Sequence, residues 1–309
     1  MSLLANLFVP PGEAGAASPE LQRNFFDCLR LKNGVYKTTY PHRLDDLNTR
    51  VADYLPASRP LRLLDVGISS GVSTLEWMDS LEAARIDYHM TGIDLTIDGL
   101  LVSFGDRLHA VLDGTKWPLL FEIDGQWLSN PPRKRHLVRH FFSLALVKYA
   151  LFLWARRYRE SEFEQVQRIL GMPTTTRAIH LVTPGLMNHP RVTIAEGNIL
   201  TQSGLQGEFH AIRAANILNR GYFDDDTLTK ILQNLRRHLT PNGILAVCQT
   251  HDEESVNRAA IFELGEDNRF AVLAKMSGGS EIEDLILQLP TASAHSPVIH
   301  NSELAYSAE

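Results

Sequence analysis

The sequence predicts an α/β fold with a mostly parallel, Rossmann-like sheet. Short apolar runs at 61–67 and 88–94 each reach an acidic residue near their end, as buried parallel strands do before a turn. Further strand-like runs follow at 191–200, 209–219 and 244–249, and helical patterns occupy several of the stretches between the strands. This β-α-β order with short linkers indicates parallel strands joined by crossover helices.

The end of the domain is predicted to differ from the parallel part. The runs 259–265 and 270–276 are separated by a short polar turn and predict a terminal antiparallel hairpin. Residues 223–239 form an amphipathic helix pattern that opens with three aspartates, which favour an N-terminal turn. The expected organisation is an N-terminal tail with helices (1–58), a sheet domain (59–290) and a disordered polar tail (291–309).

Composition narrows the functional classes. The 309-residue chain has a formal net charge of -6, so a global basic field for nucleic acid is not expected. Cys28 and Cys248 lie far apart in sequence and give neither metal-ligand spacing nor a disulfide framework, so no metal is expected. The first 20 residues lack the basic and apolar regions of a secretory signal, and the expected location is the cytoplasm.

The strongest motif is the loop LLDVGISSG at residues 63–71. Its strand delivers Asp65 and Gly67 to the carboxyl edge of the sheet, and Gly67 and Gly71 let the backbone pass close to a ligand. Asp65 can order the loop or reach an ammonium group through water. Ser69 replaces the middle glycine of the dinucleotide motif, and the loop has no phosphate-binding lysine. S-adenosylmethionine (SAM), a cation without phosphate, suits such a loop; a tight turn without a ligand is the alternative.

Asp94 strengthens the cofactor hypothesis, because an acid at the end of the second strand can accept both ribose hydroxyls of an adenosine. Leu95 follows it, and a helix N-cap is the alternative role for Asp94. Since Asp94 ends a strand, the sequence also suggests that it is dispensable for folding. The other predicted cofactor residues end the third and fourth strands: Gly197, Asn198 and Ile199 near the adenine, and Ala215 and Asn216 near the methyl group.

The motifs KTTYPHR, LLDVGISSGVSTLEWMDSL, TGIDLT, EGNIL and FHAIRAANILNRGYFDDDTL resemble, in this order, the class I SAM-dependent methyltransferases, and among them the chemotaxis receptor glutamate methyltransferases. The resemblance covers roughly residues 35–100 and 190–250. It implies a class I methyltransferase sheet and a SAM cofactor, with Arg43 near the cofactor or an accepting carboxylate and Asn216 near the transferred methyl group. With Tyr40, a candidate wall of the acceptor pocket, these are the predicted catalytic residues.

Residues 100–190 are too long for one crossover helix and are expected to form an insertion that acts as a lid or as an interaction subdomain, with a hairpin near its start. The apolar run 141–155 is shorter than the ~20 residues that span a bilayer. Basic residues flank it within 133–159. Three interpretations stay open: a buried core or homodimer helix, a lid over an apolar pocket, and a helix in a membrane interface.

The expected function is O-methylation of a small acceptor that is hydrophobic or carries a carboxylate. A carboxylate is already ionised at neutral pH and needs no general base, and the sequence shows no clear candidate for one. The alternatives are a protein carboxyl (glutamate) methyltransferase and a non-catalytic SAM-binding or scaffold protein. Nucleic acid is not an expected partner.

Overall fold

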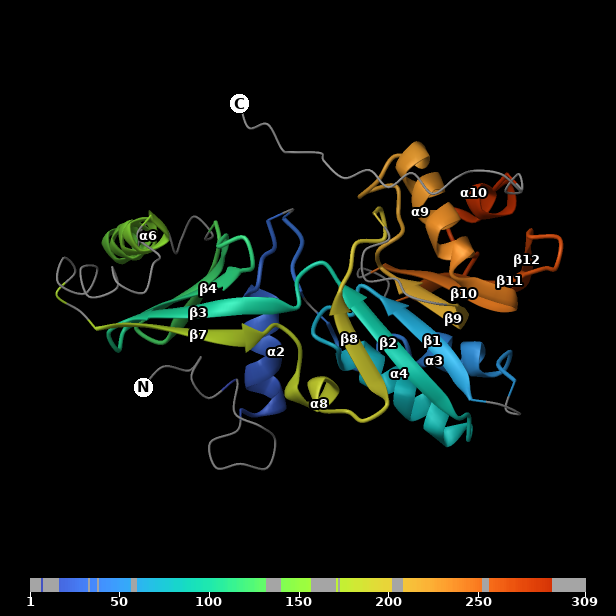
Figure 1. Cartoon of the computed structure of the whole chain (residues 1–309), viewed down its shortest axis with the longest axis horizontal. Coiled ribbons are helices and arrows are strands. Elements are labelled where there is room, and N and C mark those ends of the chain that lie inside the picture. Colours follow the sequence, from blue (N-terminus) through green and yellow to red (C-terminus); the bar gives the residue numbers. More distant parts are fainter. Residues whose placement is uncertain are drawn as a thin grey trace.

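A computed structural model of the chain describes residues 7, 17–32, 34–37, 39–56, 60–131, 140–156, 171, 173–201, 208–251 and 256–290. A seven-stranded sheet in the order β12-β11-β10-β9-β1-β2-β8 forms the larger part of the molecule (Figure 1). Its strands are β1 (Leu61–Val66), β2 (Tyr88–Asp94), β8 (Val192–Glu196), β9 (Phe209–Ala215), β10 (Leu239–His251), β11 (Val256–Leu264) and β12 (Phe270–Met276).

The pairing confirms the predicted fold class. β8, β2, β1, β9 and β10 pair in parallel in this order, and the order reverses between β1 and β9, as it does in doubly wound nucleotide-binding folds. β11 runs antiparallel to both β10 and β12, so the terminal hairpin is also confirmed.

Helices cover both faces of this sheet (Figure 1). α3 (Asp45–Ala52) and α4 (Val72–Ala83) pack on one face, where Trp77 is fully buried. α9 (Asp225–Arg237) and α10 (Glu283–Leu287) cover the other face. The carboxylate of Asp224 caps α9 by accepting the backbone N–H of Thr227 at 2.8 Å, which explains the aspartate run at its start.

The expected insertion forms a sheet of its own. Its strands are β3 (Asp98–Phe104), β4 (Leu108–Asp113), β5 (Pro118–Ile123), β6 (Gln126–Ser129) and β7 (Thr174–His180), in the antiparallel order β6-β5-β4-β3-β7. The predicted hairpin is β4–β5. The chain leaves the main sheet after β2 and returns through the short helix α8 (Pro184–Met187) to β8.

The insertion sheet is covered on both faces. Leu108, Ala110 and Leu112 of β4 face α6 (Phe141–Arg156), while Val111 faces the opposite side, as the two-residue period of a strand requires. That opposite side is packed by α2 (Pro19–Cys28), through residues such as Phe25. The N-terminal helices are therefore divided between two cores: α2 joins the insertion and α3 joins the main sheet.

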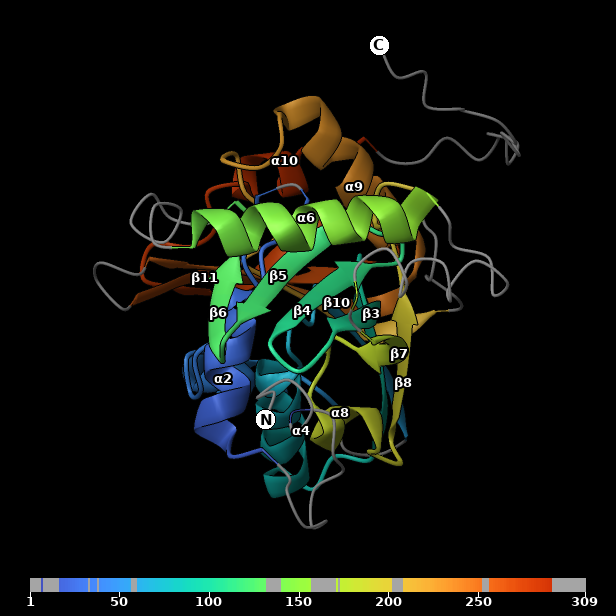
Figure 2. The ribbon, with the colours of Figure 1, turned by 90° about the vertical axis from the view of Figure 1, so that its left-hand side faces the viewer.

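α6 lies across the insertion sheet, at the end of the molecule remote from β9 and β10 (Figures 1 and 2). Its inner face buries Leu144, Val147, Ala150 and Leu151, which fits a core helix. Its outer face is exposed, and α6 does not lie over the carboxyl ends of β9 and β10, as a lid would. The basic residues of 133–139 and 157–159, and the tail 291–309, are outside the described residues.

The two faces of α6 predict opposite effects of the same substitution. Leu144→Ala should lower the free energy of unfolding by about 2–5 kcal/mol, because a buried side chain is lost and a cavity remains. Leu146→Ala, on the exposed face, should cost about 1 kcal/mol or less. Urea melts of both variants measure this, and equal losses would show that the faces are assigned wrongly.

Candidate cofactor site

The carboxyl edge of the main sheet carries the predicted cofactor loop at the point where the strand order reverses. Open α/β sheets bind ligands in the crevice beside such a reversal, here between β1 and β9. Gly67, Ser69 and Gly71 after β1, and Asn216 after β9, all have positive φ angles. Ser69 and Asn216, at 54° and 61°, adopt a conformation that is uncommon for residues with a side chain. Seven other non-glycine residues of the described chain also have positive φ angles, so the angles mark this crevice only because two of them lie at the reversal of strand order.

Asp65, the acid of the loop, is paired with a buried arginine. Arg213 of β9 donates to its two carboxylate oxygens at 2.9 and 2.6 Å, and the Thr74 hydroxyl donates to it at 2.7 Å. Arg213 also donates to the Asn48 side chain at 2.6 Å, and its guanidinium lies 4.5 Å from the centroid of the Trp77 ring. Asp65 therefore ties β1 to β9 and to the first turn of α4, and these contacts order the loop.

Asp94, the predicted ribose acid, faces a buried lysine. The Nζ atom of Lys37 lies 3.2 Å from Asp94 Oδ1 and donates to the Ser69 carbonyl oxygen at 3.2 Å. The backbone N–H of Ser69 donates to Asp94 Oδ2 at 2.7 Å, and the Ser69 hydroxyl donates to the Lys37 carbonyl oxygen at 2.9 Å. The side chain of Lys37 is only 1% exposed. The structure thus argues against the expectation that Asp94 is dispensable for folding, because its loss would leave a buried cation unpaired.

Side chains of the protein fill the space beside the two glycines. A Cβ atom at Gly67 would lie 2.4 Å from Ile217 Cδ1, and one at Gly71 would lie 2.5 Å from Leu186 Cδ2. A small cavity of about 20 Å³ remains between the loop, Thr39, Arg43 and the carboxyl end of β9. This volume holds about one water molecule, whereas small-molecule pockets are typically about 300–1,000 Å³. The crevice is therefore closed in this arrangement.

A chain of hydrogen bonds holds Asn216. Its Oδ1 accepts the Thr250 backbone N–H at 2.6 Å, and its Nδ2 donates to the Thr250 hydroxyl at 3.1 Å. That hydroxyl donates to Asn257 Oδ1 at 2.9 Å, and Asn257 Nδ2 donates to the Arg43 carbonyl oxygen and to Asp46 Oδ1 at 2.6 and 2.7 Å. The network connects the end of β9, through β10 and β11, to Arg43 before α3 and to Asp46 in its first turn.

The ends of β2 and β8 present a more open surface. Leu95 and Leu200 are 55% and 40% exposed; Leu95 follows the buried end of β2, whereas β8, which precedes Leu200, has no buried residue. Asn198 Oδ1 accepts the Leu200 backbone N–H at 2.9 Å, and the Gly197 N–H donates to the Asp94 carbonyl oxygen at 2.8 Å. Ile199 is buried in the core beneath α9. Two exposed leucines therefore follow the carboxyl ends of the neighbouring strands β2 and β8.

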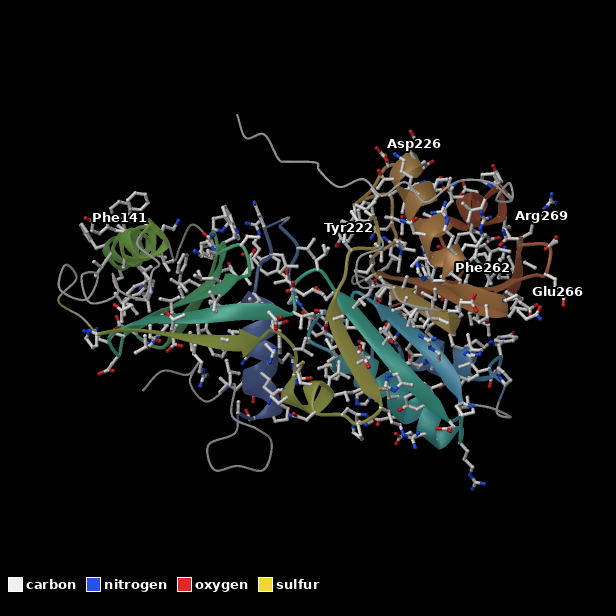
Figure 3. The ribbon with its side chains drawn as sticks, in the orientation of Figure 1. Phe141, Tyr222, Asp226, Phe262, Glu266 and Arg269 are labelled. Carbon is white, nitrogen blue, oxygen red and sulfur yellow. The ribbon has the colours of Figure 1, made fainter. Side chains whose placement is uncertain are left out.

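The predicted acceptor residues are not gathered in one place. Arg43 lines the small cavity with Ala215, next to the loop. Tyr40 is half exposed and does not line that cavity. Tyr222, a third tyrosine candidate for the acceptor pocket in the sequence beside Tyr36 and Tyr40, lies exposed near the start of α9 (Figure 3).

Lys37, Arg213, Thr250 and Asn257 are the functional candidates that sequence reasoning missed. Of these four residues, only Arg213 could have been found from the sequence. It is a charged residue inside an apolar strand, and burying a charge is unfavourable unless the charge has a partner.

Burial shifts three titratable groups near the site. It lowers the pKa of Lys37, and the facing Asp94 carboxylate opposes that shift. It raises the pKa of Glu76, whose carboxylate accepts the His42 backbone N–H at 2.7 Å. It raises the pKa of Cys248 to about 12, so this thiol is protonated and unreactive at neutral pH. Of the three groups with a shifted pKa, Lys37 is thus the one that contacts two predicted cofactor residues, Ser69 and Asp94.

Comparison with known proteins gives structural matches only. No family model and no curated protein matches the chain. The N-methyltransferase NodS from Bradyrhizobium japonicum, solved with S-adenosyl-L-homocysteine, is 12% identical, with 76% of each chain covered and a TM-score of 0.32. An O-methyltransferase family protein from Burkholderia thailandensis is 12% identical, with 67% of this chain and 38% of that chain covered and a TM-score of 0.31.

The CMeT domain of the citrinin polyketide synthase is 15% identical, with 66% of this chain and 33% of that chain covered and a TM-score of 0.30. The chain spans less than half the length of the first solved structures that it matches. None of the three proteins named is a chemotaxis receptor methyltransferase. Sequence identities and TM-scores this low do not transfer ligands or substrates from one protein to another. What the three proteins bind and methylate therefore remains a property of those proteins.

The buried pair at the loop predicts a large effect on stability. Arg213→Met should lower the free energy of unfolding by about 3–5 kcal/mol, because Asp65 would stay buried without its cation. Arg269→Met changes the same side chain on an exposed turn (Figure 3) and should change stability by no more than about 0.5 kcal/mol. Urea denaturation measures both, and a mild Arg213→Met variant would contradict the assigned role.

Proposed function

We propose that the chain is a SAM-dependent methyltransferase whose cofactor site is the crevice between β1 and β9. The observation that carries the proposal is the clustering of four positive φ angles, two of them at Ser69 and Asn216, at the reversal of strand order. The glycine loop and Asp94 lie at the same edge, in the order that a nucleoside site needs.

The adenosine half of SAM fits the residues present. The Asp94 carboxylate offers about four acceptor positions and receives Lys37, the Ser69 N–H and the Thr96 N–H; the fourth position and the one that Lys37 gives up can accept the two ribose hydroxyls. Leu95 and Leu200 supply exposed apolar surface for the adenine.

The methionine half needs a rearrangement, because Ile217 and the small cavity leave it no room. Residues 36–37 and 39–43, here named the cover segment, close the crevice through Lys37, Thr39 and Arg43. Lys37 joins the cover segment to the loop and to Asp94, while His42 and Arg43 join it to Glu76 and Asn257. We infer that the Lys37 end of the segment moves outward when the cofactor binds, because the methionine half has no room otherwise.

The chemistry proposed for the chain is orientation and exclusion of water. When bound, SAM supplies a methyl group activated on a sulfonium. Asn216 is held rigidly by Thr250, so it can position an acceptor without reorganisation. Arg43 places a cation at the crevice, which favours a small acceptor with a carboxylate; such an acceptor needs no general base.

One observation favours a second candidate function, a scaffold protein without a cofactor. The same closed crevice, with Arg213 on Asp65 and Lys37 on Asp94, satisfies both predicted ligand acids internally. The two candidates differ in whether the folded protein binds the cofactor product.

Calorimetric titration with S-adenosylhomocysteine separates them. The wild type should bind, and Lys37→Met/Asp94→Asn should raise Kd by about tenfold to a hundredfold, because the ribose loses a charge-assisted acceptor while no buried charge is stranded. The control Lys275→Met/Glu283→Gln removes an ion pair between β12 and α10 and should leave Kd unchanged. Folded wild type that gives no heat at millimolar ligand would favour the scaffold.

The proposed contact between Leu95 and the adenine has its own test. Leu95→Ser should raise Kd for S-adenosylhomocysteine by about fivefold, because apolar contact of roughly 1 kcal/mol is lost. Leu287→Ser, an exposed leucine of α10, is the matched control and should have no effect. Binding that is indifferent to Leu95 would place the adenine elsewhere.

A further inference from the structure

The outer face of α6 is the most apolar exposed helix surface in the described part of the chain. Phe142 is 85% exposed, and the other exposed large apolar residues of the helix are Phe141, Leu146, Tyr149 and Phe152. Positions 142, 146 and 149 are three or four apart and so adjoin on one face. Figure 3 shows Phe141 pointing away from the sheet. A contiguous apolar patch of this kind marks an interaction site, whereas single exposed apolar residues do not.

The sequence around this face is strongly basic. Residues 125–159 contain eight Lys and Arg residues and no Asp or Glu, although the whole chain has a net charge of -6. Lys148 of α6 is exposed at the edge of this face next to the insertion sheet, where its Nζ atom lies 6.0 Å from the centroid of the Phe121 ring. Charge and apolar surface are therefore concentrated in the same part of the chain.

We propose that this face docks on an anionic lipid surface. An interfacial helix buries apolar and aromatic side chains at the headgroup boundary, and its basic residues attract anionic lipids. The helix would lie on the membrane, since no helix among the described residues is long and apolar enough to cross one. The inner face stays on the insertion sheet, so docking needs no unfolding.

A second copy of the chain is a poorer occupant of the same face. A twofold interface brings the same patch from both subunits together. Basic residues occur at both ends of α6 in the sequence, so either helix orientation would bring like charges close together. An anionic surface satisfies the apolar face and the basic flanks together.

A cavity of about 470 Å³ beside α6 also combines apolar walls with basic side chains. Leu112, Trp117, Leu151 and Phe152 give it apolar walls, and Lys116 and Lys148 are the charged residues that line it. This combination suits an acyl chain whose anionic headgroup stays near the lysines.

Co-sedimentation of the full chain with vesicles tests the proposal. The protein should pellet with vesicles of phosphatidylcholine plus phosphatidylglycerol, much less with phosphatidylcholine alone, and less as salt rises. Phe142→Ser/Tyr149→Ser should weaken binding by about tenfold or more, because two exposed apolar side chains are lost. Lys148→Glu should also weaken binding, while Leu287→Ser on α10 should not.

Urea melts should show that the α6 variants fold like wild type, since these side chains are exposed. No pelleting with anionic vesicles would overturn the proposal, as would binding that survives Phe142→Ser/Tyr149→Ser. Sedimentation equilibrium without lipid identifies the rival occupant: a dimer that Phe142→Ser/Tyr149→Ser dissociates, combined with no vesicle binding, would assign the face to a second copy.

Discussion

The buried pair between Lys37 and Asp94 is the interaction on which the candidate site depends. A lysine that is 1% exposed loses its hydration, and the carboxylate of Asp94 and the Ser69 carbonyl oxygen replace it. Such a pair is weak evidence for stability, because desolvation offsets the attraction, but it strongly restricts geometry. It joins the cover segment to the loop and to the end of β2. Whether the crevice is open or closed follows from whether Asp94 is matched to Lys37 or to a ligand.

The insertion gives the molecule a second region with separate physical properties. It replaces the connection between β2 and β8, and its sheet needs both α2 and α6 to bury its two faces. The large apolar residues on the outer face of α6 stay exposed. The site chemistry and the surface chemistry thus lie in different parts of the fold, so each can be altered without the other.

Local patterns predicted much of the fold, and long-range partners account for what they missed. The strands of the main sheet, α4, α9, the terminal hairpin and the β4–β5 hairpin follow from periodicity, glycines and helix caps, which depend on neighbouring residues; β3, β6 and β7 of the insertion were not predicted. The positions of Asp65, Asp94 and Asn216 at one edge follow from parallel topology. Their partners Arg213, Lys37 and Thr250 come from segments that are distant in the sequence. The periodicity of a segment does not predict which distant residue it will contact. The packing of α2 on the insertion was missed for the same reason: an apolar helix face does not identify the sheet that it covers.

In the proposed function, the cover segment exchanges its contact with Asp94 for a cofactor. Amide hydrogen exchange of the full chain, with and without S-adenosylhomocysteine, measures this exchange of contacts. We expect the ligand to change the exchange of the cover segment and of the loop 67–71, while β11 and β12 stay the same. Exchange that is identical at both segments under saturating ligand would contradict the account, and would make the crevice a packing feature of the sheet.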